Sequence, residues 1–161
     1  MKHTGTTAPP QGPAPEAGAP YPHRIAFPEP HRHGILFGHD RDYTALTNWV
    51  WAVVPRRAAK PVSLVAEALT SNAHKHTRSG DPGGTVRVVI DVDPFLITIA
   101  VTDGGPRSDS VIAYPRLGDP RLAPLPGLHL VDQLAVYWEW DWALPGVGRG
   151  PLTIRAKVEN Q

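Results

Sequence analysis

The sequence predicts an α+β fold in which three helices pack on one face of a mostly antiparallel sheet. Two segments, 85–92 and 95–102, alternate apolar and polar residues around a short turn, as neighbouring antiparallel strands do. Two segments with apolar residues at helical spacing precede them, and one more helix and two strands follow. Because strands and helices mix without a strict β-α-β repeat, we expect a two-layer sandwich.

The length and composition of the chain indicate one domain with little net charge. The 161 residues include 16 basic and 15 acidic side chains and no cysteine. This balance gives no electrostatic footprint for nucleic acid, and the lack of cysteine excludes disulfides and thiolate metal sites. Apolar runs are too short to cross a bilayer, and the N-terminus lacks the apolar core of a signal peptide. We expect a soluble cytoplasmic protein with no membrane or direct nucleic-acid partner.

The N-terminal part divides into a tail and the start of the domain. Residues 1–22 are rich in Pro, Gly, Ala and Thr without periodicity, which is typical of a disordered tail, and residues 23–161 form the domain. Segments 24–27 and 34–37 predict an edge strand or a hairpin, because the prolines between them disfavour a central strand.

A first amphipathic helix is predicted from an N-cap at Asp40 to Pro55, since apolar residues recur at steps of 3, 4 and 3 from Tyr43 to Val53. A second helix has Pro61 in its first turn and continues to about residue 77.

The apolar stripe of the second helix continues through Asn72 and His76. An unpaired buried amide costs about 1–3 kcal/mol, so Asn72 either ties down neighbouring backbone or faces a polar pocket. His76 either ties the core together or supports a ligand-binding residue. His74 lies off the stripe, and we expect it to be solvated.

The second strand places Phe95, Ile97, Ile99 and Val101 on one face, and Asp103 follows in the same parity. A carboxylate that ends a core-facing row is costly unless it is paired. Asp103 is therefore expected at a pocket rim or against a buried donor, with a strand-end cap as the simpler alternative.

The remaining elements are a loop and three short segments. Residues 106–126 contain several prolines and predict a lid, since loops of this length inside a domain usually bind or cover something. A helix is predicted over 127–138 and strands over 137–142 and 152–158. Trp138, Trp140 and Trp142 share one face of their strand. They either fill the sheet face under the helices or mark an open surface for a partner protein or a homodimer.

Three motifs together resemble a known ATP-binding domain. They are Asn72-Ala-His-Lys-His76-Thr in a helix, Asp103-Gly-Gly105 at a strand end, and Pro126-Gly127-Leu-His-Leu-Val131-Asp opening a helix after the loop. The chain, over about residues 27–158, resembles the GHKL domain, or Bergerat-type fold, of anti-sigma factor serine kinases, histidine kinases, gyrase-type ATPases and Hsp90-type chaperones. It is most similar to the stand-alone anti-sigma branch, which also carries Arg-Ser-Gly-x-Pro-Gly-Gly after the first motif.

The resemblance implies ATP and Mg2+ as cofactors. It implies that Asn72 is the Mg2+ ligand, that Asp103 accepts the adenine amino group, and that Gly105 lets the backbone approach the base. Gly127 and Leu128 would open a helix toward the phosphates.

Two further residues are weaker nucleotide-binding candidates under the same resemblance. They are His76, near the Mg2+ ligand, and Thr153, near adenine. The strand parity of Thr153 places it opposite Leu152 and Ile154.

The sequence departs from the family at two places. The family's general base, a glutamate four residues before the asparagine, is Ala68 here, and Glu67 is a weak substitute because it lies roughly 140° around the helix from Asn72. Leu125 and Pro126 replace part of the Gly-x-Gly that precedes the last helix, which removes a backbone donor.

The expected function is a nucleotide-binding regulatory protein resembling anti-sigma factors. It would control a transcription regulator by binding a sigma factor, an anti-anti-sigma factor or another regulator, with ATP and Mg2+ bound and without efficient phosphoryl transfer. Two alternatives are a nucleotide-free interaction module of the same fold and an active serine/threonine protein kinase.

Overall fold

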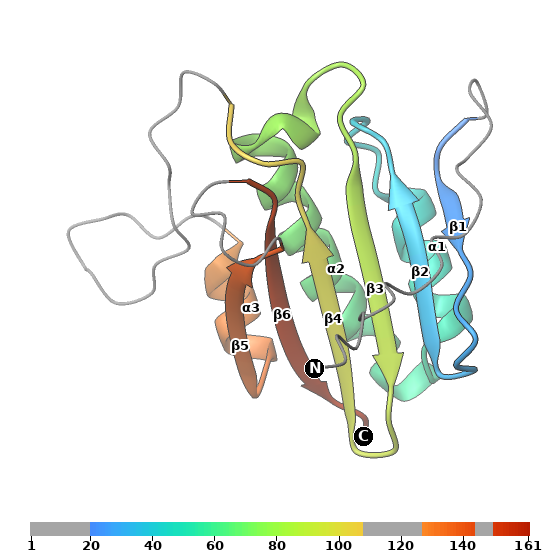
Figure 1. Cartoon of the computed structure of the whole chain (residues 1–161). Helices are drawn as coiled ribbons and strands as arrows, with labels where there is room; N and C mark the ends of the chain where they lie inside the picture. Colours follow the sequence, from blue (N-terminus) through green and yellow to red (C-terminus); the bar gives the residue numbers. More distant parts are fainter. Residues whose placement is uncertain (1–19, 108–126, 144–149) are drawn as a thin grey trace, which may run out of the picture.

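The computed structural model describes residues 20–107, 127–143 and 150–161. Its helices cover one face of a six-stranded antiparallel sheet with the order β1-β2-β3-β4-β6-β5 (Figure 1). The predicted α+β sandwich is therefore confirmed. Along the chain the elements are β1 (His23–Ile25), β2 (Arg32–Phe37), α1 (Thr44–Val53), α2 (Arg56–His76), the 3-10 turn η1 (Arg78–Gly80), β3 (Val86–Val92), β4 (Leu96–Thr102), α3 (Leu128–Leu134), β5 (Tyr137–Trp142) and β6 (Leu152–Glu159).

Two predicted segments fall wholly or mostly outside the described residues. They are the tail, of which only residues 20–22 are described, and the lid, of which only residues 106 and 107 are described. The substitutions at Leu125 and Pro126 lie in this second gap.

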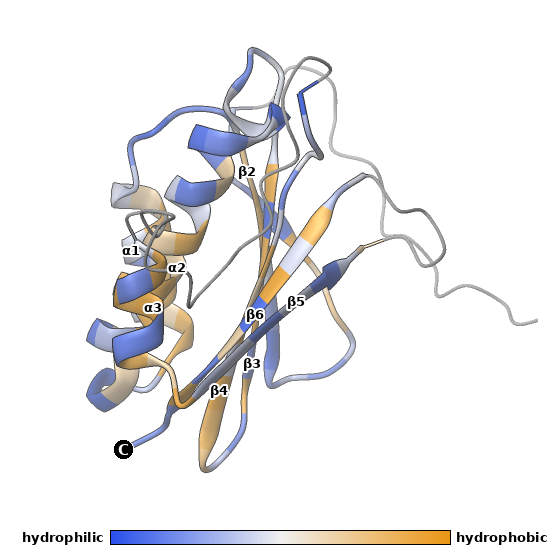
Figure 2. Ribbon diagram, turned by 90° about the vertical axis from the view of Figure 1, so that its left-hand side faces the viewer, coloured by the Kyte–Doolittle hydropathy of each residue, from blue (hydrophilic) through white to orange (hydrophobic). Residues whose placement is uncertain are grey.

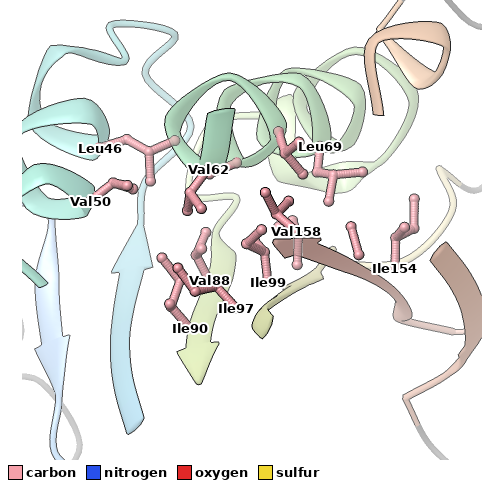
Figure 3. Close-up of a cluster of buried hydrophobic side chains, with 14 of the residues drawn as sticks. Leu46, Val50, Val62, Leu69, Val88, Ile90, Ile97, Ile99, Ile154 and Val158 are labelled. Carbon is pink, nitrogen blue, oxygen red and sulfur yellow. The ribbon is translucent and has the colours of Figure 1, made fainter. Parts of the chain in front are cut away.

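The hydrophobic core lies between the helices and the sheet, as Figure 2 shows edge-on. Strand parity decides which residues enter it, because alternate side chains point to opposite faces. Figure 3 shows side chains of α1 and α2 pointing toward those of β3, β4 and β6. The residues drawn there include Leu46, Val50, Val62, Leu69, Val88, Ile90, Ile97, Ile99, Ile154 and Val158.

The N-terminal strands form the predicted hairpin at the edge of the sheet. β1 pairs antiparallel with β2, with Ile25 opposite Gly34, and β2 continues into the sheet by pairing with β3. The three tryptophans of β5 are half-buried and pack against the core, which is the first of the two predicted alternatives. The indole N–H of Trp138 also donates to the carboxylate of Asp132 in α3, at 3.3 Å.

The structure corrects both predicted helix starts. α1 begins at Thr44, whose N–H is bound by the carboxylate of Asp42 at 3.0 Å, whereas Asp40 accepts from the N–H of Asp42. α2 begins at Arg56, so Pro61 lies inside the helix and removes one backbone donor there. Packing on the sheet compensates for that lost hydrogen bond, which a local rule for proline does not include.

Two predictions near chain reversals are also wrong. Phe95 is 85% exposed, because β4 begins only at Leu96 and Phe95 belongs to the turn before it. The last helix ends at Leu134 and not at Trp138, since Ala135 adopts an extended conformation that leads into β5.

His74 is fully buried, although the sequence predicted a solvated side chain. α2 packs against α1 as well as against the sheet, so it buries more than the single stripe counted in the sequence. The ring nitrogen Nε2 lies 2.8 Å from the carbonyl oxygen of Gly38, and Nδ1 lies 2.9 Å from the hydroxyl of Tyr43. Because a carbonyl only accepts, Nε2 carries the proton and Nδ1 accepts from Tyr43. Burial lowers the pKa of His74 below its ordinary value.

We predict that His74→Ala lowers the free energy of unfolding by about 2–4 kcal/mol at neutral pH, because a buried carbonyl and a hydroxyl lose their partner. The lowered pKa means that the folded state favours the neutral ring. The contribution of His74 is therefore complete above pH 6.5, its unfolded value, and is lost as the pH falls toward the folded pKa. Urea unfolding at about pH 7.5 and about pH 5.5 measures both effects.

The exposed His31 provides a matched control, and His31→Ala should change the stability by less than about 0.5 kcal/mol. An unchanged pH dependence in His74→Ala would contradict the assigned hydrogen bonds.

Candidate functional site

Hydrogen bonds join the end of α2 to the segment that follows β4. The N–H of Arg78 donates to the carbonyl of Gly105 at 2.9 Å. The hydroxyl of Ser79 donates to the carbonyl of Thr85 at 2.7 Å and accepts from the N–H of Gly104 at 2.8 Å. Figure 1 shows these two parts of the chain side by side at one end of the sheet. The turn η1, which directly follows the first sequence motif, therefore contacts the second motif.

Arg107 strengthens this junction. Its Nε donates to the carboxylate of Asp81 at 2.9 Å, and its terminal nitrogens donate to the carbonyls of Lys75 and His74 at 3.1 and 3.4 Å. These carbonyls belong to the last turn of α2, where a cation is favourable. We call the residues 103–107 that dock on α2 and η1 the docked segment.

Asp103 begins the docked segment and is partly buried. Its Oδ1 accepts from the N–H groups of Gly105 at 2.7 Å and Leu152 at 3.1 Å. Burial raises the pKa of the Asp103 carboxyl, and these two backbone bonds partly offset the rise. Within the described ranges both bonds go to Oδ1, so Oδ2 keeps its capacity to accept from a ligand. The carboxylate thus caps the strand and can still face a pocket.

Gly105 has a backbone conformation that other residues rarely adopt. Its φ is +93°, and an added Cβ would lie 3.3 Å from the carbonyl carbon of Gly150 and 3.4 Å from the nitrogen of Pro151. The docked segment therefore packs closely on the chain that leads into β6, as expected for a glycine that permits close backbone approach.

Asn72 carries a buried oxygen without a partner. Its Oδ1 has no hydrogen bond in the described part of the chain, a condition shared by the hydroxyls of Ser63 and Thr70 in the same helix. Leaving such an atom unpaired costs about 1–3 kcal/mol. Asn72 differs from the two hydroxyls in its place around the helix, because it lies about 40° from Ala68, which faces the start of α3, whereas Ser63 and Thr70 lie more than about 130° from Ala68.

The start of α3 lies against α2 one turn before Asn72. Gly127 has a φ of +102°, and an added Cβ would lie 3.7 Å from the Cβ of Ala68. Ala68 is only about 40° from Asn72 around the helix, so this face of α2 is turned toward α3. Leu128 is buried in the core, and α3 has only seven residues, which limits its dipole.

The structure does not bring Thr153 to these residues. The predicted strand parity is confirmed, but it turns Thr153 to the sheet face away from the helices, where its hydroxyl bonds that of Thr102 at 2.8 Å. Asn72 lies on the opposite side of the sheet.

His76 and Glu67 are both exposed. Partial burial and the charges of Lys75 and Arg107 lower the pKa of His76. Glu67 is five residues before Asn72 in the continuous helix α2, so it lies roughly 140° around the helix from Asn72.

Sequence reasoning did not identify Ser79 and Arg107. Ser79 belongs to the Arg-Ser-Gly-x-Pro-Gly-Gly motif, which supported the family resemblance without a role for the serine, so that motif was the available signal. Arg107 had no signal, because its partners are backbone carbonyls of a helix end.

The described residues contain no group of three or more His, Asp or Glu side chains that could hold a metal ion. An ion such as Mg2+ would need oxygens from a ligand as well as Asn72, which agrees with its habit of binding few protein groups and keeping waters or phosphates. None of the described helices is both long and apolar enough to span a membrane. No protein-family model matches the chain, and no curated protein matches its sequence.

We predict that Gly105→Ala lowers the free energy of unfolding by about 2–3 kcal/mol, since it adds crowding to an unfavourable left-handed conformation. Gly83→Ala is the matched control: its φ is +79°, and an added Cβ would meet nothing within 4 Å. We expect that control to cost about 1 kcal/mol in chemical unfolding. Equal losses for both variants would contradict the close packing at Gly105.

Proposed function

We propose that the chain is a nucleotide-binding regulatory protein of the GHKL type, similar to anti-sigma factors, and that it binds ATP with Mg2+ between α2 and the docked segment. The observation that carries this proposal is the buried Oδ1 of Asn72, which has no hydrogen-bond partner in the described part of the chain and belongs to the helix whose last turn contacts the docked segment. An unpaired acceptor at this place suits a ligand to a hard cation.

Each remaining group has a role that its contacts support. Asp103 is held by two backbone bonds to one oxygen, so its second oxygen is fixed in position to accept from the adenine amino group. The resemblance gives Gly105 the role of letting the backbone approach the base, and in the structure its missing side chain lets the docked segment pack on Gly150 and Pro151. Asn72 would hold the Mg2+ ion, which bridges the phosphates of ATP.

Phosphoryl transfer is not part of the proposal. A general base must come within about 3 Å of the proton it removes. Ala68 has no such group, and Glu67 lies roughly 140° around α2 from Asn72. The chain would instead act in the cytoplasm by binding a protein partner, either a sigma factor, an anti-anti-sigma factor or another transcription regulator, with ATP affecting the shape of its surface.

A nucleotide-free interaction module of the same fold is the second candidate. The short α3 favours it, because seven residues give little help in binding phosphate. An active protein kinase would need a general base other than Glu67.

We predict that Asp103→Asn lowers the affinity for ATP roughly 10- to 100-fold, because an amide keeps its oxygen on the two backbone donors and turns its NH2 toward the adenine amino group. Inosine triphosphate has a carbonyl in place of the adenine amino group, so the affinity of Asp103→Asn for this nucleotide should not fall below that of the unaltered protein. Calorimetric titration with each nucleotide, with and without Mg2+, measures the change in preference.

Asp93→Asn is the control, since Asp93 is exposed in the turn between β3 and β4 and should leave both affinities unchanged. If millimolar ATP with Mg2+ gave no heat with the unaltered protein, the nucleotide-free module would replace the proposal.

A further inference from the structure

The sheet face turned away from the helices carries a hollow of about 390 Å³. Its floor is made of small side chains on β3, β4 and β6, and charged side chains stand on either side. Arg32 and Arg87 rise on the side of β2 and β3, and Arg155 rises on the side of β6. Figure 2 shows this face on the side of the sheet opposite α1, α2 and α3.

Strand register explains the shape of the hollow. Arg87, Thr102 and Thr153 lie opposite one another on β3, β4 and β6. In the next row on this face, Ala100 lies opposite Arg155. Short side chains therefore occupy the centre, and the guanidinium groups of Arg87 and Arg155 border it from strands that are two spacings, or about 10 Å, apart.

Phe27 holds the two arginines at one side. An added Cβ on Gly34 would lie only 2.6 Å from the ring of Phe27, so the ring rests directly on the sheet at this glycine. The guanidinium carbons of Arg32 and Arg87 lie 4.8 and 5.9 Å from the centre of that ring. These cation–π contacts restrict both side chains before any ligand binds.

The charges around the hollow leave an excess of one positive charge. Arg155 pairs with Asp141 at 3.0 Å, and Arg32 pairs loosely with Asp91 at 3.8 Å. Arg87 makes no ion pair in the described ranges, and the lining includes three arginines against these two aspartates.

The floor adds a hydrogen-bond donor. The hydroxyls of Thr102 and Thr153 lie 2.8 Å apart, so one of them donates to the other. The accepting hydroxyl keeps its own proton for a third partner. This donor belongs to the same row of the sheet as Arg87.

We propose that this hollow binds a small organic molecule with two acidic groups, carboxylates or phosphates, at most about 10 Å apart. Arg87 and the threonine pair take one acidic group, and Arg155 takes the other while it keeps its contact with Asp141. The volume lies in the range of small-molecule sites. The site is on the opposite face of the sheet from Asn72, so it does not depend on the proposed nucleotide site.

The test is calorimetric titration of the full chain, at constant ionic strength and without nucleotide, with linear dicarboxylates of about four to ten carbons. We expect one chain length to bind best. Arg87→Gln should lower that affinity at least about tenfold, and Thr102→Val should lower it a few-fold. Arg87→Lys keeps the positive charge but loses the paired N–H donors of the guanidinium group. Its affinity for the dicarboxylate should therefore lie between that of the unaltered protein and that of Arg87→Gln.

Arg24→Gln is the matched control, because Arg24 is exposed on the edge strand β1 and does not line the hollow. The proposal is overturned if no dicarboxylate binds at millimolar concentration, or if Arg24→Gln and Arg87→Gln lower the affinity equally. A polyglutamate peptide that binds more tightly than every dicarboxylate would also overturn it, since the face would then recognise an acidic protein segment.

Discussion

The docked segment depends on the hydroxyl of Ser79, which joins two chain segments by donating to one backbone carbonyl and accepting from one backbone N–H. With the bond from Arg78 to Gly105, it fixes the chain leaving β4 on the end of α2. Asp103 and Asn72 come from different layers of the fold, so their relative position depends on this junction. Arg107 adds an ion pair and two carbonyl contacts to it.

The alternation of side chains along β4 places residues of different chemical character on opposite faces of the sheet. Val101 enters the core, Thr102 faces the outer hollow, and Asp103 returns to the helix side at the strand end. The helix side combines a partly buried carboxylate, held by two backbone donors, with an unpartnered amide oxygen that is unfavourable for folding unless a ligand uses it. The outer side presents arginines and hydroxyls to solvent. One strand therefore supplies residues to both proposed sites.

The sequence was sufficient to predict features that follow from the alternation of side chains along a strand or from the order of the elements along the chain. It predicted the layers and the orientation of Thr153, and the N-terminal hairpin and the inward tryptophans of β5 were each one of two stated alternatives. It failed for His74, because helical periodicity describes one buried stripe and α2 packs on two neighbours. It also missed Arg107, whose partners are carbonyls set by the fold. Only the family resemblance led us to expect that the segment carrying Asn72 and the segment carrying Asp103 lie close together.

Paramagnetic broadening in NMR spectra tests the central claim most directly, with Mn2+ in place of Mg2+ in the ATP complex. We expect the side-chain amide signal of Asn72 to broaden strongly, because its oxygen would ligate the ion. The methyl signal of Thr153, on the other sheet face, should broaden far less. Equal broadening at both positions, or none at Asn72 when ATP and Mn2+ are both present, would contradict the assignment of a nucleotide site between α2 and the docked segment.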